Sequence, residues 1–312
     1  MTIGQTSIKL STVVEHALRR AGTPPEAQTP EIIDTAKNNL FFILTNYANK
    51  GMTYWCVQEQ FLTLTQGKRN NVLPDGTVDI YNANLRRNTV ATGTDVIDST
   101  SITRTFTTST EVVMFKLDSS FSGVVTINID GTNHSTITHG GSETWYALDP
   151  TVSCTDFKLT AASAATFTEV VVVSSYADIP MYRMNRTDYS QLPSKTTQGQ
   201  PLQFWYDRQL SPEMVLWPAP NSDSETDCIQ YFRNHQISDV GSLTENLGIP
   251  DRWLQATIWA LAQDMAIELP NTPPERVTLC ATMAAQTLNE VQNEERDNSP
   301  VSFYPAIGVY SA

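Results

Sequence analysis

The chain has 312 residues and a formal net charge of −13. This length is enough for about two domains with a sizeable apolar core. The sequence contains no apolar run of about 18 residues, so we expect no membrane-spanning helix and no membrane partner. The acidic balance argues against a protein that holds nucleic acid by neutralising phosphates.

The cysteines and the first residues indicate a reducing compartment. Residues 1–7 lack the basic and apolar regions of a secretory signal peptide. The cysteines are far apart and form no CxxC pair, which is typical of free thiols. They are Cys56, Cys154, Cys228 and Cys280. We therefore expect no disulfide, no bound metal and no cofactor.

Two helices are predicted near the N-terminus. Apolar residues recur at helical spacing between 10 and 21, and Gly22 is placed to end that helix. Thr29 and Pro30 have the residue types preferred at the cap and first position of a second helix, which we expect to reach Lys50. A strand-like stretch then leads to the turn Leu73-Pro-Asp-Gly76.

The segment 92–178 is rich in Ser and Thr and has no helical period. Turn signals separate short runs of β-forming residues, at 101–106, 112–117, 124–129, 136–139, 144–148, 156–159 and 169–173. Strands at this spacing predict an antiparallel β-sandwich. The segment contains ten acidic and three basic residues, a net charge of −7. We expect an inserted domain on an exposed surface.

Mixed sequence returns after the insert. Strands are predicted at 204–206, 214–217 and 228–232, and two helices follow, at about 251–269 and 273–291. The predicted fold class is α+β: a helical bundle with a small antiparallel β element, plus the inserted antiparallel β-sandwich. The main domain is then discontinuous, with residues 1–91 and 179–295.

An extended C-terminal arm is predicted at 296–312. The polar run 292–300 ends the last helix, and Pro305 and Gly308 disfavour a further one. We expect the apolar side chains of the arm to dock on another subunit. These partner-docking residues are Phe303, Tyr304, Ile307 and Tyr310. The alternative is that the arm folds back on its own domain.

No catalytic set is evident from the residues. His134 and His139 lie near Asp130, but strand alternation disfavours a shared metal site. Asp264 lies within an apolar helix without an assignable second acid, so we expect it at the polar edge of that helix. We therefore predict that the protein is not an enzyme.

Aromatic residues of the insert have two interpretations. Trp145, Tyr146 and Phe121 could stack on sugars, or they could belong to the core of the sandwich, which we favour. Basic residues occur in local pairs, for which we expect contacts with neighbouring subunits or solvent rather than with DNA. These pairs are Arg19 and Arg20, Lys68 and Arg69, and Arg86 and Arg87.

The order of several short motifs is similar to that of a known family. The motifs are Asn46-Tyr-Ala-Asn-Lys-Gly51, Tyr54-Trp55, Leu73-Pro74, Gly199-Gln-Pro-Leu-Gln-Phe-Trp-Tyr-Asp207, Val215-Leu-Trp-Pro-Ala-Pro220, Ile249-Pro-Asp-Arg-Trp253 and Trp259-Ala-Leu-Ala262. Over about 7–90 and 180–295, the chain resembles the head-to-tail adaptor proteins of short-tailed bacteriophages, also called tail tubular protein A or head-completion proteins. The insert departs from that family's pattern.

The resemblance implies a structural virion protein without catalytic residues. Such adaptors form homo-oligomeric rings, expected here to be a dodecamer, that connect the portal protein to the tail nozzle protein. Double-stranded DNA passes through the ring without sequence-specific binding during ejection. The expected location is the neck or tail of the virion, and the host cytoplasm during assembly. The C-terminal region of the family typically docks onto the portal.

Two other functions remain open from the sequence. One is a carbohydrate-binding tail or capsid accessory protein that acts through the β insert. The other is a hydrolase of cell-wall glycans, which needs two carboxylates at a defined separation. The insert has many acidic residues, but no such pair can be assigned.

Overall fold

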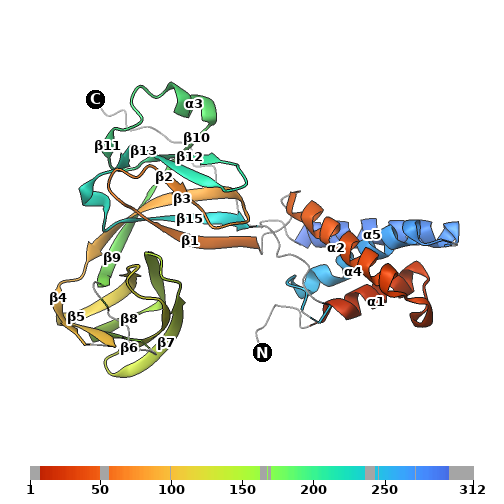
Figure 1. Ribbon diagram of the computed structural model, residues 1–312, viewed down its shortest axis with the longest axis horizontal. Coiled ribbons are helices and arrows are strands. Elements are labelled where there is room, and N and C mark those ends of the chain that lie inside the picture. Colours follow the sequence, from red (N-terminus) through yellow and green to blue (C-terminus); the bar gives the residue numbers. More distant parts are fainter. Residues whose placement is uncertain are drawn as a thin grey trace, which may run out of the picture. The chain divides into compact units, whose positions relative to one another are not determined.

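The computed structural model divides into two compact units, Met1–Cys56 with Gln236–Ala312, and Val57–His235. We call the first the helical unit and the second the β unit (Figure 1). The structure describes residues 8–49, 56–98, 100–161, 167, 170–235, 243–244, 246–270 and 272–294.

Four helices share one apolar core in the helical unit. They are α1 (Leu10–Ala21), α2 (Pro30–Asn49), α4 (Asp251–Glu268) and α5 (Pro274–Glu294), with a short 3-10 turn at Pro25–Ala27. Trp253 is fully buried and packs on Tyr47, with 5.3 Å between the ring centroids. Among the described residues, no helix has the length and hydropathy of a membrane-spanning segment.

Local signals account for the ends of the first two helices. Gly22 follows α1 with a φ of 110°, and its N–H donates to the carbonyls of Leu18 and Arg19. This left-handed conformation is easily adopted only by glycine. Helix α2 begins at Pro30, and the Thr29 hydroxyl accepts a long hydrogen bond (3.4 Å) from the N–H of Ile32. The predicted end of the first helix at Gly22 and the predicted start of the second at Pro30 are confirmed, and the predicted end of the second helix at Lys50 lies outside the described residues.

The β unit is built on one nine-stranded sheet, in which every pairing is antiparallel. Its strands, in spatial order, are β1 (Val57–Thr63), β15 (Cys228–His235), β3 (Thr77–Val90), β9 (Val170–Pro180), β5 (Ser101–Leu117), β8 (Thr144–Ala161), β6 (Gly123–Ile129) and β7 (Thr132–His139). Strand β4 (Gly93–Ile97) pairs with the first half of β5. The sheet curls, and Figure 1 shows β4 to β8 wrapped around one end of the unit.

A smaller, four-stranded sheet covers the other end of the β unit (Figure 1). Its strands, in spatial order, are β10 (Tyr182–Met184), β12 (Gln203–Asp207), β13 (Glu213–Trp217) and β2 (Asn70–Val72). A two-stranded ladder, β11 (Gln198–Gly199) with β14 (Ala219–Pro220), lies beside it, as do the helix α3 (Arg186–Gln191) and a 3-10 turn at Ser222–Ser224.

Separate apolar clusters fill the two ends of the β unit. Between the two sheets lie Phe204, Tyr206 and Leu216 of the small sheet with Leu85 and Tyr231 of the large one. A second cluster lies within the curl formed by β4 to β8, and includes Phe115, Phe157 and Val125. The β unit thus has two cores joined by continuous strands.

The predicted fold class is wrong. The described chain is mostly antiparallel β structure, its helices are few and do not form a bundle, and the strands of 92–178 are part of the large sheet instead of a separate sandwich. The reason is long-range pairing: β15, near residue 230, pairs with β1 and β3, and β3 pairs in turn with β9. Periodicity in a sequence carries no information about such partners.

Strand length also differs from expectation. The predicted runs 101–106 and 112–117 are one strand, β5, and 144–148 and 156–159 are one strand, β8. Their pairing is irregular between Thr105 and Thr110, so these strands bend where a turn was expected. The boundaries predicted for an inserted domain, 92 and 178, remain a prediction; they fall just after β3 and near the end of β9.

Candidate functional site

The four residues predicted to dock on a partner lie outside the described residues. They are Phe303, Tyr304, Ile307 and Tyr310. The docking arm therefore remains a prediction.

His139 is a core histidine with both ring nitrogens in use. Its Nε2 lies 2.8 Å from the carbonyl oxygen of Asp118, and its Nδ1 lies 2.8 Å from the Tyr146 hydroxyl. A carbonyl only accepts, so Nε2 carries the proton and Nδ1 accepts from Tyr146 in the neutral ring. His134 is exposed and contacts Ser135. In the described ranges no three His, Cys, Asp or Glu side chains gather as a metal site would require.

The aromatic residues of the insert are core residues. Phe121 and Trp145 are each 2% exposed, and the Phe121 ring stacks on His139 with 6.0 Å between centroids. Tyr146 is half-buried and stacks on Phe115 at 5.5 Å. The interpretation of Phe121 and Trp145 as core residues is confirmed, and Tyr146 packs against the same core.

Asp264 is half-buried on α4, at the edge of the helical core. Burial raises the pKa of its carboxyl, and the nearby charge of Glu268 raises it further. Burial likewise raises the pKa of Tyr47 to about 12, with a smaller effect from Asp264. Both effects come from the apolar surroundings rather than from a paired catalytic group.

The basic pairs have different roles in the structure. Arg19 forms an ion pair with Glu15 one turn away, and the Arg20 guanidinium lies 4.3 Å from the centroid of the Trp259 ring. Arg69 donates to the carbonyl of Lys195 at 3.4 Å. Arg86 is only 6% exposed. The prediction was that these pairs contact neighbouring subunits or solvent. For Arg86, which is buried, this prediction is wrong.

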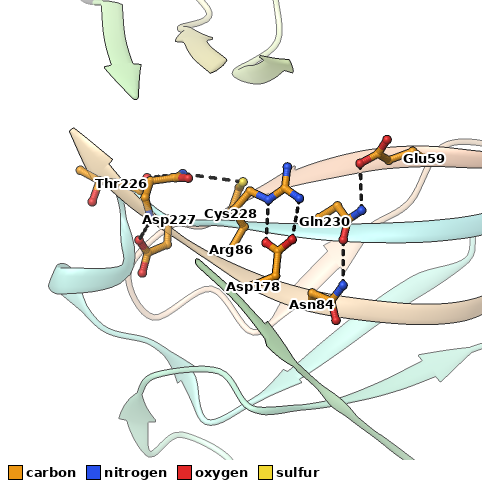
Figure 2. Close-up of polar contacts among 9 residues, drawn as sticks. Glu59, Asn84, Arg86, Asp178, Thr226, Asp227, Cys228 and Gln230 are labelled. Atoms are coloured by element: carbon orange, nitrogen blue, oxygen red, sulfur yellow. Dashed lines mark hydrogen bonds and ion pairs between the residues drawn. The ribbon is translucent and has the colours of Figure 1, made fainter. Parts of the chain in front are cut away.

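Arg86 joins strands β3 and β9 through a two-point ion pair (Figure 2). Its Nε and Nη2 each lie 2.7 Å from one carboxylate oxygen of Asp178. The guanidinium carbon lies 3.7 Å from the ring centroid of Tyr176 and 5.4 Å from that of Phe61. Burial alone would lower the pKa of Arg86, but the hydrogen bonds and charge of Asp178 outweigh burial and raise it.

Amide side chains continue this polar row across the sheet. Gln230 accepts from Asn84 at 2.9 Å and donates to Glu59 at 2.8 Å, so one side chain links β3, β15 and β1. Figure 2 shows these residues beside the Arg86 pair. The N–H of Asn88 donates to Asp227 at 2.9 Å. The row therefore cross-links four neighbouring strands on the face opposite the core between the sheets.

The titratable groups of this row are structural. Burial raises the pKa of the Cys228 thiol to about 12, so the thiol stays protonated and is a poor nucleophile at neutral pH. Burial also raises the pKa of Asp227, against smaller effects from the N–H of Asn88 and the charge of Arg87. The arrangement fixes strands rather than activating a reacting group.

The outer face of the four-stranded sheet has the features of a binding surface. Side chains alternate along β12: Phe204 and Tyr206 point into the core, whereas Trp205 lies on the opposite side. Tyr189 of α3 stacks on Trp205 with 5.1 Å between centroids. The indole N–H of Trp217 donates to the carbonyl of Ser194 at 2.9 Å. Helix α3 and the following loop are thus held over this face.

A pocket of about 450 Å³ lies in the helical unit, and one of about 420 Å³ lies beside the outer face. The second opens where β10 leads into α3, and Trp205 and Tyr206 line it. The N–H of Asp188 donates to the Asn185 side chain at 2.8 Å, which caps α3 at this point. The other lining residues are Arg183, Met184, Asn185, Arg186 and Asp188.

Large apolar side chains surround this region in exposed positions. Tyr182 is 76% exposed, and its N–H bonds the carbonyl of Leu202, which is 45% exposed. Val72, on the other edge strand of the sheet, is 62% exposed. Leu210, in the β12–β13 connection, is fully exposed. Exposed apolar side chains near an aromatic pocket are typical of a protein–protein contact surface.

Sequence reasoning identified these strands but missed their outer face. The run Phe204-Trp-Tyr206 has aromatic residues at every position, so alternation of polar and apolar residues gives no signal for the exposed side. A usable signal was the exposed position of Leu210 in a polar connection, Arg208-Gln-Leu-Ser-Pro212.

Comparison with protein-family models and with curated proteins finds no match to this chain.

We predict that the Arg86–Asp178 pair stabilises the β unit cooperatively. Asp178→Asn should lower the free energy of unfolding by about 2–3 kcal/mol, because it leaves the buried Arg86 guanidinium without its charged partner. Arg86→Met should cost less, because the Asp178 side chain that it leaves unpaired is 31% exposed. The double variant should lose clearly less than the sum, since no unpaired charge remains. Urea denaturation of the four proteins measures this coupling.

Arg208→Met is the matched control for this cycle. Arg208 also pairs with a carboxylate, Asp79, but its side chain is 63% exposed, and such pairs contribute at most about 1 kcal/mol. Strictly additive losses in the double variant, or losses no larger than that of the control, would contradict the role of the buried pair.

We also predict that the native thiols resist alkylation. All four cysteines are buried, and burial raises the pKa of Cys154 to about 11 and that of Cys228 to about 12. Iodoacetamide at pH 8 should therefore label none of them in the native protein and all of them in urea, as read by intact mass. Rapid native labelling of Cys228 would show that its burial is wrong.

The raised pKa values of Cys154 and Cys228 also predict that the free energy of unfolding depends on pH. A thiol whose folded pKa is raised contributes stability that is complete below its unfolded pKa, about 8.5. That contribution is lost as the pH rises from there toward 11 and 12, because the unfolded thiols ionise first. The midpoint of urea unfolding should fall across this alkaline range.

Proposed function

We propose that this protein is a structural component of a bacteriophage virion, a head–tail connector. Its copies form a ring, expected to be a dodecamer, that joins the portal protein to the tail nozzle protein and lines the DNA conduit. The observation that carries this proposal is the exposed apolar surface at the four-stranded sheet: Tyr182, Leu202, Val72 and Leu210. Leaving such side chains in water is unfavourable unless a partner covers them.

The position of the family-like motifs supports the same function. The segment 199–207 contributes β12, and 215–220 contributes most of β13 and all of β14. Tyr182 and Leu202 lie directly beside these strands. The motif Ile249-Pro-Asp-Arg-Trp253 leads into α4, with Trp253 at the centre of the helical core. The residues that resemble an adaptor therefore build the contact surface of the β unit and the core of the helical unit.

The chemistry of the chain suits a conduit rather than a catalyst. With a net charge of −13, the ring has no general basic surface to displace counterions from duplex DNA, so DNA passes without a tight or sequence-specific grip. This role places the protein in the virion neck or tail, and in the host cytoplasm during assembly. The C-terminal residues Phe303 and Tyr304 would contact the portal.

The carbohydrate-binding alternative has less support. It relied on Trp145, Tyr146 and Phe121, and these side chains are packed in or against the cores of the β unit. No comparable observation favours a glycan hydrolase, so the connector is the function we propose.

The proposed function predicts a closed ring that depends on the outer face. The purified protein should form a large ring in native mass spectrometry and negative-stain microscopy, and the ring should bind the portal. A variant with Tyr182→Ser and Leu210→Ser should fold but assemble more weakly, with a loss of about 2 kcal/mol or more for a buried anchor. A control is Phe42→Ser, a change of another large exposed apolar side chain, in the helical unit.

A protein that stays monomeric at high concentration, with or without portal, would contradict the connector. If the double variant assembles at the same concentration as the wild-type chain, the ring remains our proposal, but this face is not one of its subunit contacts.

A further inference from the structure

The pocket at the start of α3 is basic and aromatic in an otherwise acidic chain. Arg183 and Arg186 line it together with one carboxylate, Asp188, and with Trp205 and Tyr206, of which Trp205 has its side chain on the outer face of the sheet. The Trp205 wall is rigid because Tyr189 stacks on it and because β12 is paired on both sides. A preorganised wall of this kind reduces the entropy lost on binding.

The two arginines differ in how they are held. Arg183 donates to Asp79 at 2.6 Å and to the carbonyl of Ile80 at 2.8 Å, and Arg208 binds the other oxygen of Asp79 at 2.6 Å. Two guanidinium groups thus share one carboxylate. Arg186 is exposed and forms no ion pair with any described residue. The pocket therefore contains one arginine, Arg186, whose charge no ion pair with a described residue neutralises.

A complementary acidic tip lies at the β6–β7 turn and the adjacent part of β8. Asp130 and Gly131 form its turn with φ angles of 46° and 79°. The Asp130 carboxylate accepts from the N–H of Asp156 at 2.8 Å and from that of Thr155 at 2.9 Å. These N–H groups, that of Asp156 first, lower the pKa of Asp130, so it is ionised. Asp156 is also exposed, and neither carboxylate forms an ion pair with a described residue.

The tip projects into solvent. No heavy atom lies within 4 Å of the position that a Cβ on Gly131 would take. Figure 1 shows the hairpin strands at the opposite end of the β unit from α3. Within one β unit the tip therefore cannot reach the pocket, and the two features can meet only between copies.

We propose that the Arg183–Arg186 pocket binds the acidic Asp130–Asp156 tip of a second copy of this chain. A contact between different surfaces on two copies is heterologous, and repetition of it generates either a closed ring or a filament. The inference rests on the proposed ring and names one of its subunit contacts. It also gives a role to the segment 92–178, which supplies the tip.

A second copy fits the pocket better than DNA does. The pocket is about 420 Å³ in volume, a size that takes a few side chains. The neighbouring copy brings a segment with a net charge of −7, so attraction between opposite charges favours this pairing. Tyr182 and Leu202, which are exposed beside β10 and β12, add apolar contact area that a phosphate backbone would not use.

A charge-reversal experiment on the full chain tests the contact. Arg186→Glu and Asp156→Arg should each weaken self-association on the order of tenfold, measured by sedimentation velocity over a concentration series. A chain that carries both changes restores an opposite-charge pair between copies, so its association should return toward the wild-type value. Lys9→Glu, an equal charge change at an exposed site of the helical unit without a described ion pair, should have little effect.

The outcomes separate this contact from the ring itself. If wild type and the Arg186→Glu variant assemble equally, or if the double variant is no better than the weaker single variant, the pocket–tip contact is wrong while the ring stands. If Arg186→Glu lowers binding of a 30-base-pair duplex and leaves assembly unchanged, the pocket is a nucleic-acid site and the inference is overturned. If the wild-type chain does not self-associate at all, both the contact and the proposed function fail.

Discussion

The junction between β3 and β9 is the constraint on which the β unit depends. Here the first strands of the unit meet the strands of 92–178, and Arg86 and Asp178 face each other across the pair. A guanidinium that is 6% exposed has lost most of its hydration, so its carboxylate partner must stay in place. Once this junction is fixed, β9 leads directly into β10, and the four-stranded sheet can close over the core between the sheets.

The buried polar row and the exposed face of the four-stranded sheet depend on the same strands. One face of β3 and β15 carries the polar row of Arg86, Gln230 and Asn84, and the other face packs on Phe204 and Tyr206. Because the inward side chains of β12 are fully used in that core, the alternate residue, Trp205, is left on the outer face. The exposed position of Trp205 on this surface therefore follows from the packing of Phe204 and Tyr206 in the core. The pocket beside Trp205 contains Arg183 and Arg186, and in our proposal it binds an acidic segment of a second copy.

The parts of the fold that could be predicted from sequence are those with local causes. Gly22 ends α1 because of its own backbone freedom, and Pro30 begins α2 because of its fixed φ. The fold class was not predictable in this way, since β15 joins β1 and β3 from more than 130 residues away. Likewise, the role of Arg86 could not be predicted, because its partner Asp178 is 92 residues distant and nothing in either neighbourhood indicates the pair.

The central claim is that the outer face of the four-stranded sheet is a contact surface between subunits. Hydrogen–deuterium exchange of the concentrated and the diluted protein tests it most directly, because a covered edge strand exchanges its amides more slowly. The account predicts added protection on assembly in peptides from 180–206 and around the turn at 130, with the buried strand β15 unchanged. Assembly without any change in those peptides would contradict the account.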